Sequence, residues 1–226
     1  MPPPSDLVRP PWLLFLQRHV FAIAAVAGVL TLTIIRPMTR HVPEPPQVLY
    51  SLPDYALVDH RGEAFSPETM RGKVWVAGFV FTSCPSTCPV VTKAMADLRQ
   101  RFDKMDVDVE MVSFTVDPGH DTPDVLADYF AGIGVETDKW RFVTGDPKAV
   151  IGLVRDGFKL GVGEREAAAD GTAFDIAHST KLALIDAEGG VRGFYGIEPE
   201  EGLDEIYHRA QHVLRADRLK AAEGEP

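Results

Sequence analysis

Two cysteines, Cys84 and Cys88, carry the reactive chemistry that this sequence suggests. They are the only cysteines among 226 residues, and both lie in the short segment CPSTC. An apolar run, Val74–Phe81, precedes the pair, and a helical pattern over Pro89–Asp103 follows it. Two chemistries suit a thiol pair in a strand-to-helix turn, namely reversible disulfide exchange and the capture of a soft metal ion.

The four-residue spacing of the cysteines bears on this choice. Residues four apart at the start of a helix lie on one face, so both thiols can reach one ion or each other. The unpaired N–H groups and partial positive charge of a helix N-terminus favour the thiolate. Thioredoxin-type redox motifs space their cysteines three apart, and the extra residue in this turn leaves room for an ion. An inert disulfide closing so short a loop would add little stability.

A tight metal site needs a third ligand, and His178 is the best candidate. It lies in the segment DIAHS, just before the strand pattern Lys181–Asp186. In a thioredoxin-like fold that junction faces the cysteine turn. Thioredoxin-type reductases carry a cis-proline there, but Asp175–Lys181 contains no proline. The histidine in its place favours metal binding over disulfide reduction.

The other histidines fit a ligand role less well. His120 lies in the loop DPGHDTP after a predicted strand, at the functional edge of an α/β sheet. His60 lies in a turn. The spacing of His208 and His212 could suit zinc, but both face away from the apolar stripe of their helix and are expected at the surface. The remaining two flank the apolar N-terminal segment: His19 and His41.

Periodicity and turn residues predict an α/β fold. Strands are expected over Tyr55–His60, Val74–Phe81, Val107–Val116, Trp140–Thr144, Lys181–Asp186 and Val191–Tyr195. Helices are expected over Pro89–Asp103, Pro123–Gly132 with Thr122 as N-cap, Pro147–Arg155 and Glu200–Leu219. This order, with a cysteine turn after the central strand, predicts a thioredoxin-like fold in which helices flank a central mixed sheet. The loop Gly157–Phe174 fits no pattern, and we expect it to be mobile and to carry His178.

The N-terminus predicts one transmembrane helix. Val20–Ile35 is sixteen residues long and uncharged, with Arg18 before it and Arg36 after it. A spanning helix needs roughly 17–25 apolar residues, and arginines that snorkel at both ends extend a short one. A cleaved signal peptide is the alternative. The expected organisation is a short segment (1–19), a transmembrane anchor (20–36), a Pro-rich linker (37–49), a thioredoxin-like domain (50–219) and a tail (220–226).

The net charge of −10 argues against nucleic acid as a partner. Residues 1–41 carry a charge of +3, so the remainder carries −13. Such an acidic body repels a phosphate backbone.

Three segments together resemble the signatures of one known family. FTSCPSTCP, SFTVDPGHDTP and AHSTKLALIDAEG resemble those of the Sco/SenC family, membrane-anchored, thioredoxin-like copper proteins needed to assemble cytochrome c oxidase. The match covers roughly Tyr50–Leu219. The resemblance implies that Cys84, Cys88 and His178 bind one copper ion. It also implies that Asp117 lies near this site without binding the metal. Many relatives have an arginine where this chain has His120, so the electrostatics beside the site differ.

The resemblance implies a copper metallochaperone and not an enzyme. Two thiolates and an imidazole suit Cu(I), Cu(II) would add a water or weak ligand, and zinc would prefer a fourth protein ligand. The implied partners are cytochrome c oxidase subunit II, a copper donor chaperone and a thioredoxin-like reductant. The implied location is the bacterial cytoplasmic membrane, in preference to the mitochondrial inner membrane, with the domain facing the periplasm. A thiol–disulfide reductase for the oxidase cysteines, or a redox- or copper-responsive signalling protein, remains an alternative.

Overall fold

The computed structural model describes residues 18–22, 24–26, 28–31, 44–84, 87–135, 137–161, 166–167, 174–175, 180–198 and 202–224. The chain divides into two compact units, residues 1–43 and residues 44–226. In the first unit, all the described residues are helical. No helix within the described ranges is long and apolar enough to cross a membrane. The predicted anchor, residues 20–36, lies partly outside those ranges.

A mixed eight-stranded sheet in the order β1-β10-β9-β4-β5-β6-β2-β3 forms the centre of the second unit. Its strands are β1 (Tyr50–Ser51), β2 (Leu57–Asp59), β3 (Ala64–Phe65), β4 (Trp75–Val80), β5 (Glu110–Thr115), β6 (Trp140–Thr144), β9 (Leu182–Ile185) and β10 (Gly190–Tyr195). A separate pair joins β7 (Glu166–Ala167) to β8 (Phe174–Asp175). The central strands β4, β5 and β6 are parallel, and the other neighbouring pairs are antiparallel.

The parallel strands give the sheet two distinct ends. The carboxyl ends of β4, β5 and β6 share one end, which we call the carboxyl edge, and the opposite end is the amino edge. Because β9 is antiparallel to β4, with Ala183 opposite Ala77, the chain enters β9 at the carboxyl edge. Loops that follow parallel strands therefore meet the start of β9 at one place.

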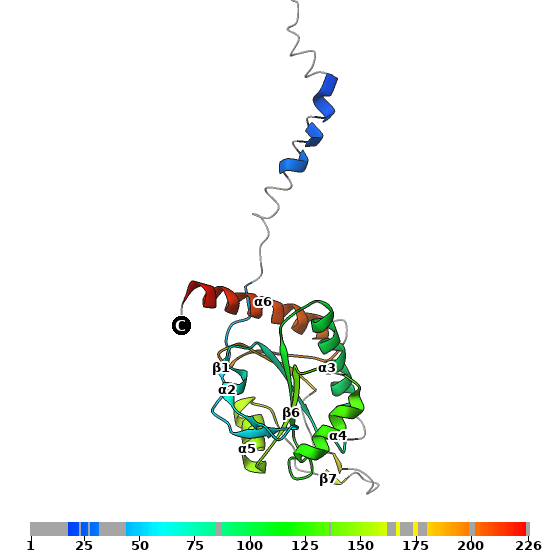
Figure 1. Cartoon of the computed structure of the whole chain (residues 1–226), viewed down its shortest axis with the longest axis vertical. Coiled ribbons are helices and arrows are strands. Elements are labelled where there is room, and N and C mark those ends of the chain that lie inside the picture. The colour runs from blue at the N-terminus through cyan, green and yellow to red at the C-terminus, as the bar shows by residue number, and fades with distance from the viewer. Residues whose placement is uncertain are drawn as a thin grey trace, which may run out of the picture. The chain divides into compact units, whose positions relative to one another are not determined.

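Helices cover both faces of this sheet (Figure 1). They are α2 (Pro67–Met70), α3 (Thr87–Lys104), α4 (Pro123–Ile133), α5 (Pro147–Gly152), the π-helical turn η1 (Leu153–Gly157) and α6 (Gly202–Glu223). On one face, Gly78 of β4 lets Met95 of α3 approach, because a Cβ atom there would meet the methionine sulfur. On the other face, the ring of Phe158 packs edge-on against Phe79, with centroids 5.0 Å apart. This two-sided mixed sheet confirms the predicted α/β class.

Local signals predicted the start of α4 correctly. Thr122 is its N-cap, and Pro123 is its first residue. The Thr122 hydroxyl accepts a hydrogen bond from the Val125 N–H at 3.4 Å. This bond satisfies one of the N–H groups that a helix start leaves unpaired.

The sequence patterns missed the shortest elements. The strands β1 and β3 have two residues each and α2 has four, too few to show a period. The predicted helix Pro147–Arg155 is α5 followed by η1, which continues to Gly157. The loop predicted to be mobile, Gly157–Phe174, lies mostly outside the described residues.

His60 lies in the predicted turn but is buried, with 9% of its surface exposed. Its Nδ1 accepts a hydrogen bond from the Phe142 N–H at 3.2 Å, and its ring packs edge-on against Phe130 at 4.9 Å. Burial lowers the pKa of this imidazole, because the charged form would lose its hydration.

We expect this histidine to make the fold acid-sensitive. Below about pH 6.5 His60 takes up a proton in the unfolded chain but stays neutral in the folded chain. The free energy of unfolding therefore decreases as the pH is lowered, by at most about 1.4 kcal/mol per pH unit. Denaturant unfolding at about pH 8 and about pH 5 should show a smaller difference for His60→Gln than for the parent. His208→Gln, at an exposed site on α6, is the control and should keep the parent difference. If His60→Gln shows the same difference in unfolding free energy between the two pH values as the parent, His60 is not the cause of the acid sensitivity.

Candidate metal centre

The cysteine turn lies at the carboxyl edge, between β4 and α3. Strand β4 is buried along its whole length and ends at Val80. The buried Phe81 follows, and its carbonyl accepts a hydrogen bond from the Cys84 N–H at 3.3 Å. Cys88 lies in the first turn of α3. The predicted order of apolar strand, cysteine turn and helix is thereby confirmed.

Two backbone contacts hold the thiols of Cys84 and Cys88 at the start of α3. The Cys88 N–H points to the Cys84 Sγ at 3.3 Å, and the Phe81 N–H points to the Cys88 Sγ at 3.3 Å. Both thiols are free of a disulfide, and their exposed fractions are 7% for Cys84 and 0% for Cys88. Both cysteines are therefore buried, and Cys84 is the less deeply buried of the two.

The protonation of Cys88 differs from the expectation for a helix N-terminus. Burial raises the pKa of its thiol, and the nearby Cys84 and Asp121 raise it further. The Phe81 N–H opposes this rise but does not overcome it. The effect of desolvation on the pKa of Cys88 thus outweighs that of the helix N-terminus, and without a metal Cys88 is a neutral thiol at neutral pH.

A buried carboxylate, Asp121, ties the cysteine turn to the loop after β5. It is fully buried and accepts hydrogen bonds from the Thr82 N–H at 3.1 Å and the Thr82 hydroxyl at 2.5 Å. It also accepts from the Thr115 hydroxyl at 2.5 Å, and His120 Nδ1 lies 3.0 Å away. Thr82 is two residues before Cys84, so this carboxylate fixes the backbone that leads into the turn. The sequence alone did not predict this role; a carboxylate directly before the Thr122 N-cap was the available signal.

Asp117, predicted to lie near the site, follows β5 at the carboxyl edge and is 8% exposed. Its backbone N–H donates to the Thr115 hydroxyl at 3.0 Å, and its carbonyl accepts from His120 and Asp121. The His120 side chain is 47% exposed and approaches the Thr82 hydroxyl at 3.4 Å. The loop is therefore a compact turn that presents an imidazole next to Thr82, two residues before Cys84.

His178, the predicted third ligand, lies outside the described residues. Within the described ranges, no group of three His, Cys, Asp or Glu side chains is placed to hold a metal ion. The zinc reading of His208 and His212 accordingly finds no support there: His208 is exposed and His212 half-buried. His19 is half-buried in the first unit, and His41 is outside the described residues.

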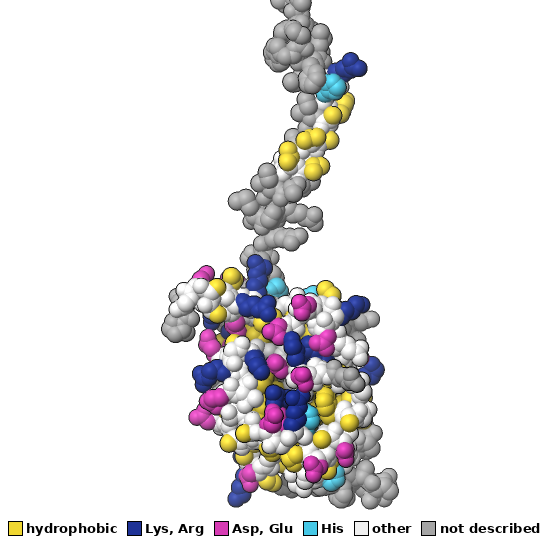
Figure 2. Space-filling model, viewed as in Figure 1, with side chains coloured by type: hydrophobic (Ala, Val, Ile, Leu, Met, Phe, Trp, Pro, Cys, Tyr) yellow, Lys and Arg dark blue, Asp and Glu magenta, His cyan; other side chains and the backbone are white. Residues whose placement is uncertain are grey.

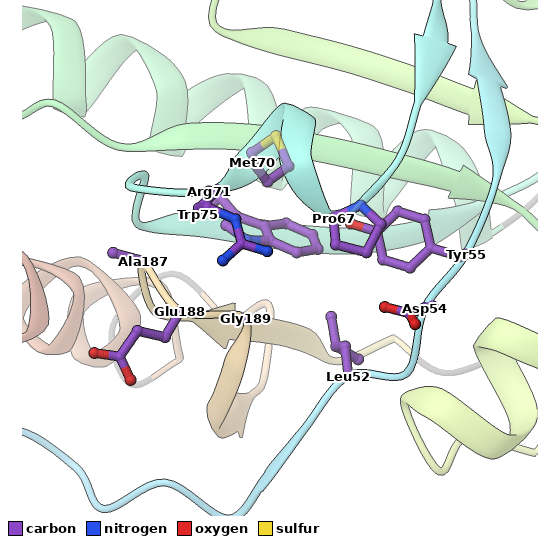
Figure 3. A pocket seen from close by; sticks show the side chains of 10 residues that line it. All are labelled: Leu52, Asp54, Tyr55, Pro67, Met70, Arg71, Trp75, Ala187, Glu188 and Gly189. Carbon is purple, nitrogen blue, oxygen red and sulfur yellow. The ribbon is translucent and has the colours of Figure 1, made fainter. Parts of the chain in front are cut away.

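One hollow adjoins the cysteine turn, and another lies at the opposite edge of the sheet. A groove of about 570 Å³ begins at Pro89, next to Cys88, and runs between α3 and α4. Thr92 and Tyr129 line it and share a hydrogen bond of 2.9 Å. A second cavity, of about 130 Å³, lies at the amino edge around Trp75 (Figure 3), and none of its ten lining residues is Cys or His. Only the first hollow adjoins the thiols.

The fold and the buried dithiol define a thioredoxin-like thiol protein. The SCO1/SenC family profile matches residues 45–215. The chain therefore belongs to the SCO1/SenC family, as the three sequence segments predicted.

Similar proteins and solved structures agree with this family and its fold. The SCO1 protein homolog of Bacillus subtilis is 30% identical over 151 residues, which span 66% of this chain and 76% of that protein. The structure of BsSco, a Sco family cytochrome c oxidase assembly protein with a disulfide switch, aligns with TM-score 0.64 and 26% identity, over 76% of this chain and 98% of BsSco. Copper-bound ScoI of Bradyrhizobium japonicum shares the fold, with TM-score 0.62 and 19% identity, over 73% of this chain and 99% of ScoI.

Proposed function

We propose that this chain is a membrane-anchored copper metallochaperone. It binds one copper ion through Cys84, Cys88 and His178 and delivers it to the copper centre of cytochrome c oxidase subunit II during oxidase assembly. The observation that carries the proposal is the pair of buried thiols held at the start of α3 in a member of the SCO1/SenC family. BsSco, a cytochrome c oxidase assembly protein of the same family, supports the assignment to oxidase assembly.

The donor set suits copper as a cargo. Sulfur ligands favour Cu(I), and an imidazole completes a three-coordinate site, which could hold Cu(II) with an added water. Because burial keeps Cys88 a neutral thiol, metal binding must displace its proton. Binding requires both thiols in the reduced state, since a disulfide has no thiolate to offer. Copper passes through this site unchanged, so the chain is not an enzyme in this role.

The difference in thiol exposure suggests an order of transfer. Cys84 is 7% exposed and Cys88 0%, so a thiolate from the recipient reaches metal first on the Cys84 side. The recipient displaces His178 first, then Cys84 and finally Cys88. Asp117, at the same edge, stays near the metal without binding it. The groove that begins at Pro89 is the adjoining surface available to the recipient.

The remaining parts of the proposal concern location and partners. Residues 20–36 anchor the chain in the bacterial cytoplasmic membrane, and the linker 37–49 holds the domain on the periplasmic side. The uncharged run Val20–Ile35 and its flanking arginines support the anchor. A copper donor chaperone loads the site, and a thioredoxin-like reductant keeps Cys84 and Cys88 reduced.

The test is the copper affinity of the detergent-solubilised full chain with and without His178. We expect His178→Ala to weaken Cu(I) binding by at least about tenfold, because two thiolates remain without the imidazole. The Cys84–Cys88 disulfide should still form on oxidation, as measured by thiol labelling and mass spectrometry. His120→Ala, the same change at the same edge, should keep the parent affinity. Equal affinity of His178→Ala and the parent for Cu(I) would show that the three-ligand site is wrong.

The second candidate function is thiol–disulfide exchange, which the disulfide switch of BsSco favours. In that reaction Cys84 attacks a partner disulfide, Cys88 displaces the partner, and the partner gains two electrons as the pair becomes a disulfide. Under the copper proposal, turnover of model disulfides is slow and insensitive to His178. Fast turnover together with no Cu(I) binding would favour the reductase.

A further inference from the structure

The amino edge of the domain brings together the entry of the chain and the carboxyl half of α6. Arg192 of β10 binds the Pro46 carbonyl and the Asp186 carboxylate, each at 2.7 Å. One residue further along, the Ala187 N–H donates to Asp217 of α6 at 3.0 Å. The entering chain at Pro46 and the carboxyl half of α6 therefore lie at the same end of the sheet, opposite the thiols (Figure 1).

Exposed apolar side chains concentrate at this edge. In the described part of the second unit, the large hydrophobic side chains with high exposure are Val48, Leu49, Val90, Met105 and Leu219. Four of these lie at the amino edge, on the entering chain, after the end of α3 and on α6. Only Val90 lies beside the cysteine turn. Single exposed hydrophobics need no explanation, but their gathering at one end indicates an interaction surface.

On this side α6 carries basic side chains, and two of them lie near acidic neighbours: Arg218 is 3.8 Å from Asp108, and Lys220 is 3.9 Å from Glu188. The α6 segment 209–220 has four Arg or Lys residues and one acidic residue, a net charge of +3 in a chain of −10. A hollow of about 450 Å³ at this place is lined by Arg215 and Arg218, by Leu214 and Leu219, and by Asp106 among others. Figure 2 shows hydrophobic and basic side chains next to one another over α6. Cationic heads beside apolar side chains match the boundary between lipid headgroups and acyl chains.

We propose that the amino edge docks on the surface of a bilayer that contains anionic phospholipids. Arg215 and Arg218 bind headgroup phosphates, and Leu219 enters the boundary with the acyl chains. The inference rests on the proposed membrane anchor and does not depend on copper. Residues 36–43 extend over at most about 29 Å, at roughly 3.6 Å per residue, so the tether keeps this edge close to the membrane. Docking leaves the carboxyl edge, with Cys84 and Cys88, directed away from the lipid.

The experiment uses the full chain, reconstituted into vesicles, with Leu219→Trp as a probe. One vesicle type is phosphatidylcholine alone, and the other is an equimolar mixture of phosphatidylcholine and phosphatidylglycerol. Subtracting the parent spectrum removes the three native tryptophans. We expect the added indole to emit at shorter wavelength, and to be less quenched by aqueous acrylamide, in the anionic vesicles. Salt at about 1 M should reverse the shift, because screening then acts within a few ångströms.

Two charge-reversal variants in the Leu219→Trp background test the assignment. Arg215→Glu with Arg218→Glu should abolish the lipid-dependent shift. Lys93→Glu with Lys148→Glu makes the same change in net charge at exposed positions toward the carboxyl edge and should retain it. An identical spectrum in both vesicle types, shifted or not, would overturn the proposal. Failure of the chain to float with vesicles would instead show that the anchor is wrong, so the two failures are distinguishable.

Discussion

Asp121→Ala is expected to lower the free energy of unfolding by about 3–5 kcal/mol. The fully buried carboxylate accepts two hydrogen bonds from Thr82 and one from Thr115, and it contacts His120 Nδ1. Alanine leaves these groups without their acceptor in a dry environment, and each buried unsatisfied group costs about 1–3 kcal/mol. Urea unfolding of the reduced protein near neutral pH measures the change.

A matched control is available three residues away. Asp124 is exposed in the first turn of α4, so Asp124→Ala removes a carboxylate but only a weak helix-dipole interaction, worth about 1 kcal/mol at most. Asp121→Asn keeps one carbonyl oxygen in place and should retain part of the lost stability. If Asp121→Ala and Asp124→Ala unfold at the same urea concentration, the buried network does not stabilise the fold as we infer.

The same substitution should also change the cysteines. Thr82 is held by Asp121 through both its N–H and its hydroxyl, and the chain reaches Cys84 two residues later. Loosening this segment opens the turn over Cys88, which has no exposed surface in the parent. A thiol reagent should therefore label Cys88 faster in Asp121→Ala than in Asp124→Ala, under conditions in which both remain folded. The carboxylate thus links the stability of the fold to access to the sulfurs.

The sequence patterns predicted the scaffold well because its signals are local. The apolar run before the cysteines is β4, which is buried along its whole length. The Thr122 and Pro123 pair marks the start of α4, since capping depends on a few neighbouring residues. The order of strands and helices then leaves few topologies, because parallel strands need helical crossovers.

The chemistry of the site was harder to predict because it depends on tertiary contacts. The preference of a helix N-terminus for a thiolate depends on neighbouring residues. The burial that raises the pKa of Cys88 instead comes from the packing of distant segments. Asp121 likewise acquires its role from Thr82, which is 39 residues away in sequence. Spacing and residue type identified the thiols, but not how deeply each is buried or what holds them.

Cys84→Ser and Cys88→Ser should each remove Cu(I) binding. Each change replaces a soft thiolate with a hydroxyl, a donor that Cu(I) disfavours. The loss should exceed the roughly 10–100-fold that follows from changes to groups around a metal's ligands. It should also exceed the loss in His178→Ala, which keeps both sulfurs. Competition against a colorimetric Cu(I) chelator, with the full chain in detergent, measures the three affinities.

The two serine variants should differ in stability, and this difference tests the geometry of the turn. Cys88 is fully buried and its sulfur accepts the Phe81 N–H, so a smaller, more polar hydroxyl disturbs a packed position. Cys84 is slightly less deeply buried, at 7% exposed, and its replacement should cost less stability. Ser83→Ala, at an exposed position in the same turn, should leave both copper affinity and stability at parent values. Retention of Cu(I) by either serine variant at parent affinity would mean that the two thiols do not share one ion.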